Sequence, residues 1–114
     1  MVLTRILSIK FASSFSYLVP PTITSFDTDN STFEHNTTLN IRCTAYGSPT
    51  PVITLLHNGS TLRTIESGGS EYYSTLSWEV ENLSPLDSGA YECIVRSELG
   101  MAQQNISIAV KGKI

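Results

Sequence analysis

The stretch Asp87-Ser88-Gly89-Ala90-Tyr91-Glu92-Cys93 decides the fold, because it joins a turn to a strand that has one apolar face. Side chains alternate along a strand, so Tyr91 and Cys93 point to one side and the residues between them to the other. A second cysteine, Cys43, lies 50 residues earlier in a segment with the same alternation, 38–45. We therefore expect two half-buried strands whose inward faces both carry a cysteine.

The same period of two recurs through the chain from Thr22 onward, with turn signals about every 8 to 12 residues. Serine and threonine make up 29 of the 114 residues, and no segment repeats apolar residues with the helical period over three turns. Besides the two cysteine strands, strands are predicted over 52–57, after Asn58-Gly59, over 73–80 and through Ile106, Ile108 and Val110. Such strands must pair their apolar faces across two sheets, so the predicted fold class is an all-β, two-sheet antiparallel sandwich.

Composition and motif content exclude several classes of function. The chain has 10 acidic and 7 basic residues, a net charge of −3, and lacks the basic surplus that binding to nucleic acid requires. The sequence contains no Gly-rich phosphate loop, no Gly-x-Ser-x-Gly motif and no ligand cluster with metal spacing. We expect no catalytic residue, metal, cofactor or small-molecule substrate, and we interpret His35 and His57 as solvated loop residues.

The two cysteines allow two interpretations. With His35 and His57 they would supply four zinc ligands, but their distance in the sequence disfavours such a site. A disulfide that closes a loop of this length would stabilise the fold by roughly 4 kcal/mol through chain entropy, and it would persist only in an oxidising compartment. The inward positions of Cys43 and Cys93 fit one bond that joins the two sheets through the core.

The asparagines indicate the compartment more strongly than the cysteines do. Five of the six begin an Asn-x-Ser/Thr sequon with no proline at x, where about 1.5 would be expected by chance at this content of Ser and Thr. The predicted glycosylation sites are Asn30, Asn36, Asn58, Asn82 and Asn105. This pattern predicts an extracellular protein, either secreted or held at the cell surface.

The first nineteen residues also allow two interpretations. Arg5 followed by the apolar run to Val19 has the outline of a signal peptide, although Lys10 interrupts the run. The alternation from Leu3 to Phe11 suits equally well the closing strand of a preceding domain. We expect the folded domain at 20–111 and a tail at 112–114. No other apolar run reaches 18 residues, so any membrane anchor is expected outside this chain.

A set of motifs occurs at defined spacings: Cys43-x-Ala45-x-Gly47-x-Pro49-x-Pro51-x-Ile53, Asn58-Gly59, Leu83, Asp87-x-Gly89-x-Tyr91-x-Cys93 and Gly100. This set resembles an immunoglobulin domain of the intermediate (I-set) type over about residues 20–111. The resemblance implies a Greek-key sandwich. It also implies that Tyr91 is a tyrosine corner, whose hydroxyl bonds the backbone near the turn shaped by Asp87 and Gly89.

The chain departs from this family at one core position. The family's tryptophan on strand C, twelve places after the first cysteine, is replaced by Leu55. The only tryptophan, Trp78, alternates with Leu76 and Val80, which predicts that it points inward. We expect Trp78 to supply, from the opposite sheet, some of the volume that Leu55 lacks.

Two surfaces are candidates for contact with a protein partner. On the strands that correspond to C, F and G of the family, the outward residues include three aliphatic side chains with charged neighbours. The predicted partner-binding residues are Val52, Leu56, Ile94, Arg96 and Met101. The other candidate is the end formed by loop 46–50 and turn 97–100, because Asn36, Asn58 and Asn82 map to the opposite end. A glycan on Asn105 would project from the first surface.

These features support three hypotheses. The first is an extracellular recognition module of a cell-adhesion or receptor-type protein, which binds a protein partner, homophilic or heterophilic, through one sheet face or the loop end. The second is a structural spacer in a multi-immunoglobulin matrix or filament protein. The third is a soluble secreted immune or decoy protein. Fold alone does not choose between them.

Overall fold

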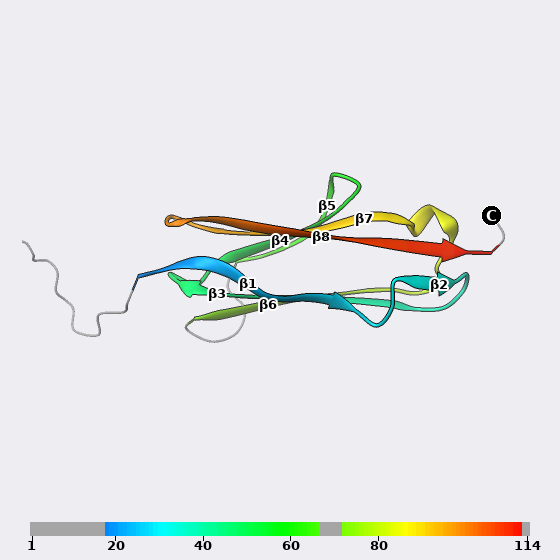
Figure 1. Cartoon of the computed structure of the whole chain (residues 1–114), viewed down its shortest axis with the longest axis horizontal. Helices are drawn as coiled ribbons and strands as arrows, with labels where there is room; N and C mark the ends of the chain where they lie inside the picture. The colour runs from blue at the N-terminus through cyan, green and yellow to red at the C-terminus, as the bar shows by residue number, and fades with distance from the viewer. Residues whose placement is uncertain (1–17, 67–71, 113–114) are drawn as a thin grey trace, which may run out of the picture.

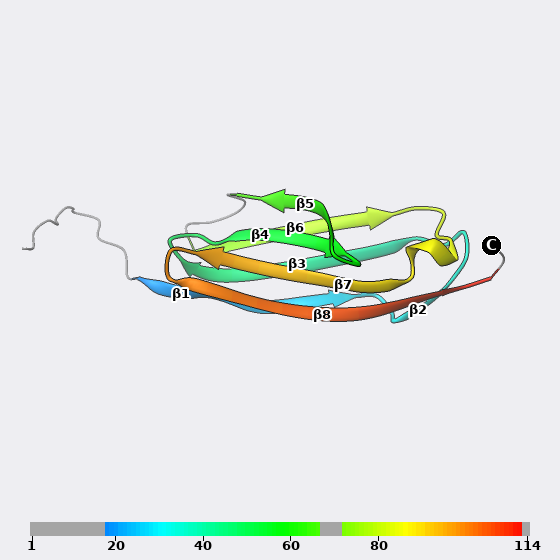
Figure 2. The ribbon, with the colours of Figure 1, turned by 90° about the horizontal axis from the view of Figure 1, so that it is seen from above.

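A computed structural model describes residues 18–66 and 72–112, in which eight strands form two sheets that pack face to face (Figures 1 and 2). Two predicted segments lie outside the described residues. They are the leader 1–19, except its last two residues, and the tail beyond Gly112. Within the described ranges, no helix has the length and apolar character needed to span a membrane.

Three strands form the first sheet, in the order β1-β3-β6. Their bounds are β1 Val19–Thr28, β3 Leu39–Ser48 and β6 Tyr73–Val80, and both pairs are antiparallel. The central strand β3 carries Cys43, and β6 forms one edge of the sheet.

Five strands form the second sheet, in the order β2-β8-β7-β4-β5. Their bounds are β2 Thr32–Glu34, β4 Val52–His57, β5 Ser60–Ile65, β7 Gly89–Ser97 and β8 Gly100–Lys111, and a 3-10 turn, η2 Pro85–Asp87, precedes β7. The predicted all-β sandwich is confirmed. One strand pair differs from the prediction, because β2 runs parallel to β8 after the chain crosses from the first sheet to the second between Thr28 and Thr32.

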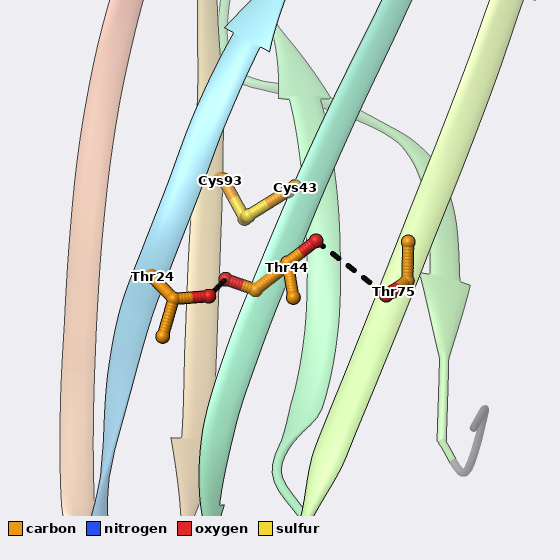
Figure 3. The surroundings of a disulfide bond; sticks show 5 residues. All are labelled: Thr24, Cys43, Thr44, Thr75 and Cys93. Carbon is orange, nitrogen blue, oxygen red and sulfur yellow. Dashed lines mark hydrogen bonds between the residues drawn. A yellow bond between two sulfur atoms is a disulfide. The ribbon is translucent and has the colours of Figure 1, made fainter. Parts of the chain in front are cut away.

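The core is built from the inward side chains that the alternation predicts. On β3, Leu39, Ile41, Cys43 and Ala45 are all buried, and the residues between them face outward or are only partly covered. The Cys43–Cys93 disulfide crosses from β3 to β7, with 6.5 Å between the two Cα atoms (Figure 3). On the outer side of β3, the Thr44 carbonyl accepts a 3.1 Å hydrogen bond from the Thr24 hydroxyl (Figure 3). β3 therefore separates an apolar interior from a more polar outer surface.

The first strand carries two prolines, and one predicted loop boundary is wrong. Pro20 and Pro21 lie inside β1, which tolerates them because it is an edge strand with an irregular register between Val19 and Thr22. β3 continues to Ser48, so Tyr46 belongs to a strand and not to the predicted loop 46–50. The connection to β4 is therefore short.

The positions of Leu55 and Trp78 in the core differ from the family pattern. Leu55 is fully buried on β4, opposite Cys93 in the ladder with β7. Trp78 is on the inward face of β6 and packs against the core, but it remains partly exposed because β6 is an edge strand. Trp78 thus contributes apolar contact at the margin of the core and not beside the disulfide, since the residue of β6 that pairs with Cys43 is Leu76.

Replacement of both cysteines, Cys43→Ala with Cys93→Ala, should lower the free energy of unfolding by roughly 4 kcal/mol, because the unfolded chain then regains the entropy of a 50-residue loop. Urea denaturation monitored by Trp78 fluorescence measures this loss. The unmutated chain under reducing conditions is the control and should show a similar shift of the midpoint. An unchanged midpoint in both samples would contradict the structural role of the bond.

Candidate functional site

The outer face of β4, β7 and β8 carries a regular grid of side chains. Residues that face each other across neighbouring strands lie on the same side of a sheet, so the two ladder registers define its rows. The three rows are Val52–Arg96–Met101, Thr54–Ile94–Gln103 and Leu56–Glu92–Asn105. We call these nine residues the β4–β7–β8 face. It brings together all five residues predicted to bind a partner.

Ile94 occupies the centre of this grid. Its diagonal neighbours on the adjacent strands are Val52, Leu56, Met101 and Asn105, at separations of about 7 to 8 Å between Cα atoms. Three of the four are apolar. Met101 is 58% exposed, whereas Val52, Leu56 and Ile94 are half-buried. The apolar residues of the face are therefore partly accessible to solvent, and Met101 is the most exposed of them.

Two opposite charges lie along β7 on either side of Ile94. Glu92 is two residues before it and Arg96 two residues after it, which places their Cα atoms about 13 Å apart on one strand. The remaining positions are uncharged, and the Thr54 hydroxyl oxygen is 3.3 Å from the Thr64 hydroxyl oxygen on β5. The face thus combines an apolar centre with a negative and a positive pole, a composition that suits contact with protein.

Tyr91 anchors the start of β7 on the inner side. Its hydroxyl donates a 2.6 Å hydrogen bond to the Asp87 carbonyl. The Asp87 carboxylate in turn accepts a 2.9 Å bond from the Ser84 amide, which closes the turn η2. Burial, and secondarily the negative charge of Asp87, raise the pKa of Tyr91 to about 12. Gly89, between them, has φ +130°, a conformation that L side chains rarely adopt.

The interpretation of both histidines as solvated loop residues is wrong. The His57 ring is partly buried and stacks on the Tyr91 ring, with 4.3 Å between centroids and 12° between planes. Its Nε2–H donates a 2.9 Å hydrogen bond to the Ser88 carbonyl. His35 is also partly buried, and the space beside Gly112 is filled by its ring. Sequence alternation alone does not reveal these contacts, because they depend on which strands are neighbours.

Asn58 extends the β4–β7 ladder by one step beyond His57. Its backbone N–H donates a 2.9 Å bond to the Ala90 carbonyl. Its side-chain Oδ1 accepts a 3.0 Å bond from the Ala90 N–H, in the place of a backbone carbonyl. The residue has φ +50°, which asparagine tolerates better than most residues. One residue therefore forms the turn into β5 and holds that turn against β7.

Comparison with known proteins agrees with this architecture. The immunoglobulin-domain family matches residues 20–97. The chain belongs to the immunoglobulin family. Over 73 residues it is 36% identical to the rat neuronal cell adhesion molecule, and over 95 residues it is 30% identical to human hemicentin-1. These matches cover 64% and 80% of the chain but only 6% and 2% of the relatives.

Solved structures show the same fold at lower sequence identity. A chimeric titin Z1Z2 that carries an exogenous peptide from decorin superimposes with a TM-score of 0.70 and 21% identity, over 85% of this chain and all of the titin chain. The immunoglobulin fold is thus confirmed, whereas the I-set type stays a prediction. The family and its adhesion-type relatives are non-enzymatic, and this immunoglobulin domain is not an enzyme.

Four of the five sequons in this immunoglobulin domain lie at the end where β8 finishes. Asn30 and Asn36 flank β2, Asn58 is in the β4–β5 turn and Asn82 follows β6. The Asn36 N–H donates a 2.7 Å bond to the carbonyl of Leu83, next to Asn82, which brings two of these connections together. The opposite end, with the β3–β4 and β7–β8 connections, carries no sequon among its described residues.

A cluster of tyrosines on the outer side of β3 and β6 was missed. Tyr46 stacks on Tyr72 with 5.8 Å between ring centroids and meets Tyr73 edge-on at 4.8 Å. Tyr46 and Tyr73 are directly opposite each other in the β3–β6 register. Outward alternation along both segments is visible in the sequence, but the prediction of a loop at 46–50 hides the pairing. Within the described residues, no group of three or more His, Cys, Asp or Glu side chains could hold a metal ion.

The raised pKa of Tyr91 predicts a loss of stability at high pH. The folded domain keeps the phenol proton at pH values where the unfolded chain, with a pKa near 10, releases it. The free energy of unfolding should therefore fall as the pH rises from about 10 to about 12. Urea titrations at several pH values measure this slope.

Tyr91→Phe is the matched variant for that measurement. It removes the hydrogen bond to Asp87 and should cost about 1 to 3 kcal/mol at neutral pH, because the Asp87 carbonyl loses its partner. The variant should also show a shallower slope between pH 10 and 12. An equal slope in both proteins would mean that Tyr91 is not the titrating group.

Asn58 offers a test that separates its structural bond from its sequon. Asn58→Gly keeps the positive φ but removes the acceptor for Ala90, so it should lower the free energy of unfolding by about 1 kcal/mol. Asn58→Asp keeps an acceptor oxygen and should retain most of the stability. Both variants destroy the sequon, so equal losses would show that the bond to Ala90 contributes nothing.

Proposed function

We propose that this immunoglobulin domain is an extracellular protein-recognition module of a cell-adhesion or receptor-type protein, and that it binds its protein partner through the β4–β7–β8 face. The observation that carries the proposal is the position of Ile94, a half-buried aliphatic residue on the outer side of β7, with apolar diagonal neighbours and with Glu92 and Arg96 on either side. Apolar residues at the centre of a contact and charged residues at its margin are typical of protein interfaces.

The alternative surface, the sequon-free end of the sandwich, offers less contact area. β3 extends to Ser48, and Ser74 donates a 2.8 Å bond to the Pro51 carbonyl, so the β3–β4 connection is short and held against β6. The β7–β8 connection is a turn of two residues, Glu98 and Leu99. Because both connections are short, few residues project from this end to contact a partner.

The extracellular assignment rests on the sequons and the disulfide. Asn30, Asn36, Asn82 and Asn105 are exposed, as glycosylation requires. The single disulfide joins the two sheets, and such bonds persist in oxidising compartments. The similarity to a neuronal cell adhesion molecule and to hemicentin-1 supports a role in adhesion.

One observation favours the second candidate, a structural spacer in a longer protein. β1 begins at one end of the sandwich and β8 finishes at the other, so neighbouring domains would extend in line (Figure 1). The chain also spans only a few per cent of its adhesion-type relatives. A spacer would bind nothing through the β4–β7–β8 face. For the third candidate, a soluble decoy, the described residues offer no specific support.

The recognition function is tested by substitution at the centre of the face. The domain, secreted from eukaryotic cells with the substitution Asn105→Gln so that the face carries no glycan, is displayed as a tetramer and applied to a panel of cell types, and bound tetramer is measured by flow cytometry. Ile94→Asp places a charge at the centre of the contact and should reduce binding by about tenfold or more.

Ser77→Asp is the matched control, because Ser77 is exposed on β6, on the outer face of the opposite sheet. It should leave binding unchanged. Circular dichroism melting curves verify that both variants are folded. Equal binding by Ile94→Asp and the unmutated domain would overturn the proposed face, and no binding to any cell type would favour the spacer.

A further inference from the structure

The β4–β7–β8 face is complementary to itself, and we propose that its partner is a second copy of this chain. This inference rests on the proposed function and deepens it, because it names the partner. Its starting point is the symmetry of the charges on β7: Glu92 and Arg96 lie at equal distances on either side of Ile94, on one strand and one face.

A twofold axis between two copies can lie across the strands, in the plane of contact. Rotation about this axis places the second copy face to face with the first and reverses its strand direction. Each strand of the face, including β7, then lies antiparallel on the same strand of the second copy. The row Val52–Arg96–Met101 then faces the partner's row that contains Leu56, Glu92 and Asn105. The central row, which contains Ile94, faces itself. A contact of this kind is isologous and closes as a dimer.

The face positions of β4 and β7 find suitable counterparts in this arrangement, and the polar residues of the central row, Thr54 and Gln103, face their own copies. Arg96 meets the partner's Glu92, and the symmetry repeats this opposite-charge pair on the other side of Ile94. Val52 meets the partner's Leu56, and Ile94 meets the partner's Ile94, so apolar area is covered by apolar area. The contact therefore has an apolar centre between two ion pairs.

The charges also disfavour a twofold axis parallel to the strands. An axis parallel to the strands would place Glu92 on the partner's Glu92 and Arg96 on the partner's Arg96. Like charges in direct contact at an interface cost several kcal/mol. Charge complementarity thus selects the antiparallel dimer, and it does so with residues of a single strand.

Asn105 makes the contact dependent on glycosylation. It is exposed on β8 beside Glu92, and the twofold axis places it opposite the partner's Met101. The asparagine side chain alone fits there, but a glycan would fill the space of the second copy. A chain that carries a glycan on Asn105 is therefore expected to be monomeric, and a chain without it is free to pair.

The expected dimer is weak. Three strands about 4.8 Å apart and five residues with a rise of about 3.3 Å cover only a few hundred Å² on each copy. Interfaces of this size belong to the transient class. Association must therefore be measured at concentrations that extend into the millimolar range.

The test is sedimentation equilibrium of the full chain, secreted with the substitution Asn105→Gln, in comparison with Glu92→Arg and Arg96→Glu made separately in the same background. Each single reversal places like charges opposite each other and should weaken self-association by about tenfold or more. An equimolar mixture of the two reversals should regain association, because an arginine of one variant would then face a glutamate of the other at both charged positions. The double variant should also self-associate.

Recovery in the mixture proves that both variants are folded, so a trivial loss of structure is separated from a loss of contact. Single reversals that associate as well as the unreversed chain, or a mixture that fails to recover, would overturn the antiparallel dimer. A chain that stays monomeric but still binds cells through Ile94 would overturn this inference and leave the proposed function intact. A monomer whose cell binding does not depend on Ile94 would overturn both.

Discussion

The Cys43–Cys93 bond is the constraint on which the rest of the domain depends. It holds β3 and β7 together through the core, and it forces the side of β7 that carries Cys93 to face inward (Figure 3). Tyr91 then points inward as well, two residues away, and its hydroxyl closes the turn that precedes the strand. Because the side-chain period of a strand is two, a shift by one residue would exchange the two faces completely.

The proposed binding face is therefore a consequence of the core. Once Cys93 faces inward, Glu92, Ile94 and Arg96 can only face outward, and β4 and β8 contribute the flanking residues through their registers. The same strand builds the interior with one set of residues and the contact surface with the other. A substitution at Ile94 or Arg96 changes the surface without entering the core, which is how related domains can share a fold and differ in partners.

Features that depend on local alternation were predictable from the sequence. The inward residues of β3 and β7, the fold class, and the outward position of Val52, Leu56 and Ile94 follow from a period of two and from apolar composition. The common end of Asn36, Asn58 and Asn82 follows from strands that alternate in direction.

Features that depend on register, or on which strand lies at an edge, were not predictable in this way. The stacking of His57 on Tyr91 and the bond from Ala90 to Asn58 join residues that are more than thirty positions apart. The tyrosine pair Tyr46 and Tyr73 appears only when β3 and β6 are aligned. Trp78 was expected to be inward, and it is, but its partial exposure reflects the position of β6 at the open margin of a sheet.

The entry and exit of the chain at opposite ends has a mechanical consequence. Tension applied between Val19 and Lys111 would run along the strands, since β1 starts at one end and β8 finishes at the other. Hydrogen bonds between β7 and β8 lie across that direction over the whole length of the ladder, and the short parallel pair of β2 with β8 adds to them. Such bonds are loaded in shear and must yield together, not one after another from an end. The arrangement therefore makes the domain resistant to extension along the axis that joins its two ends.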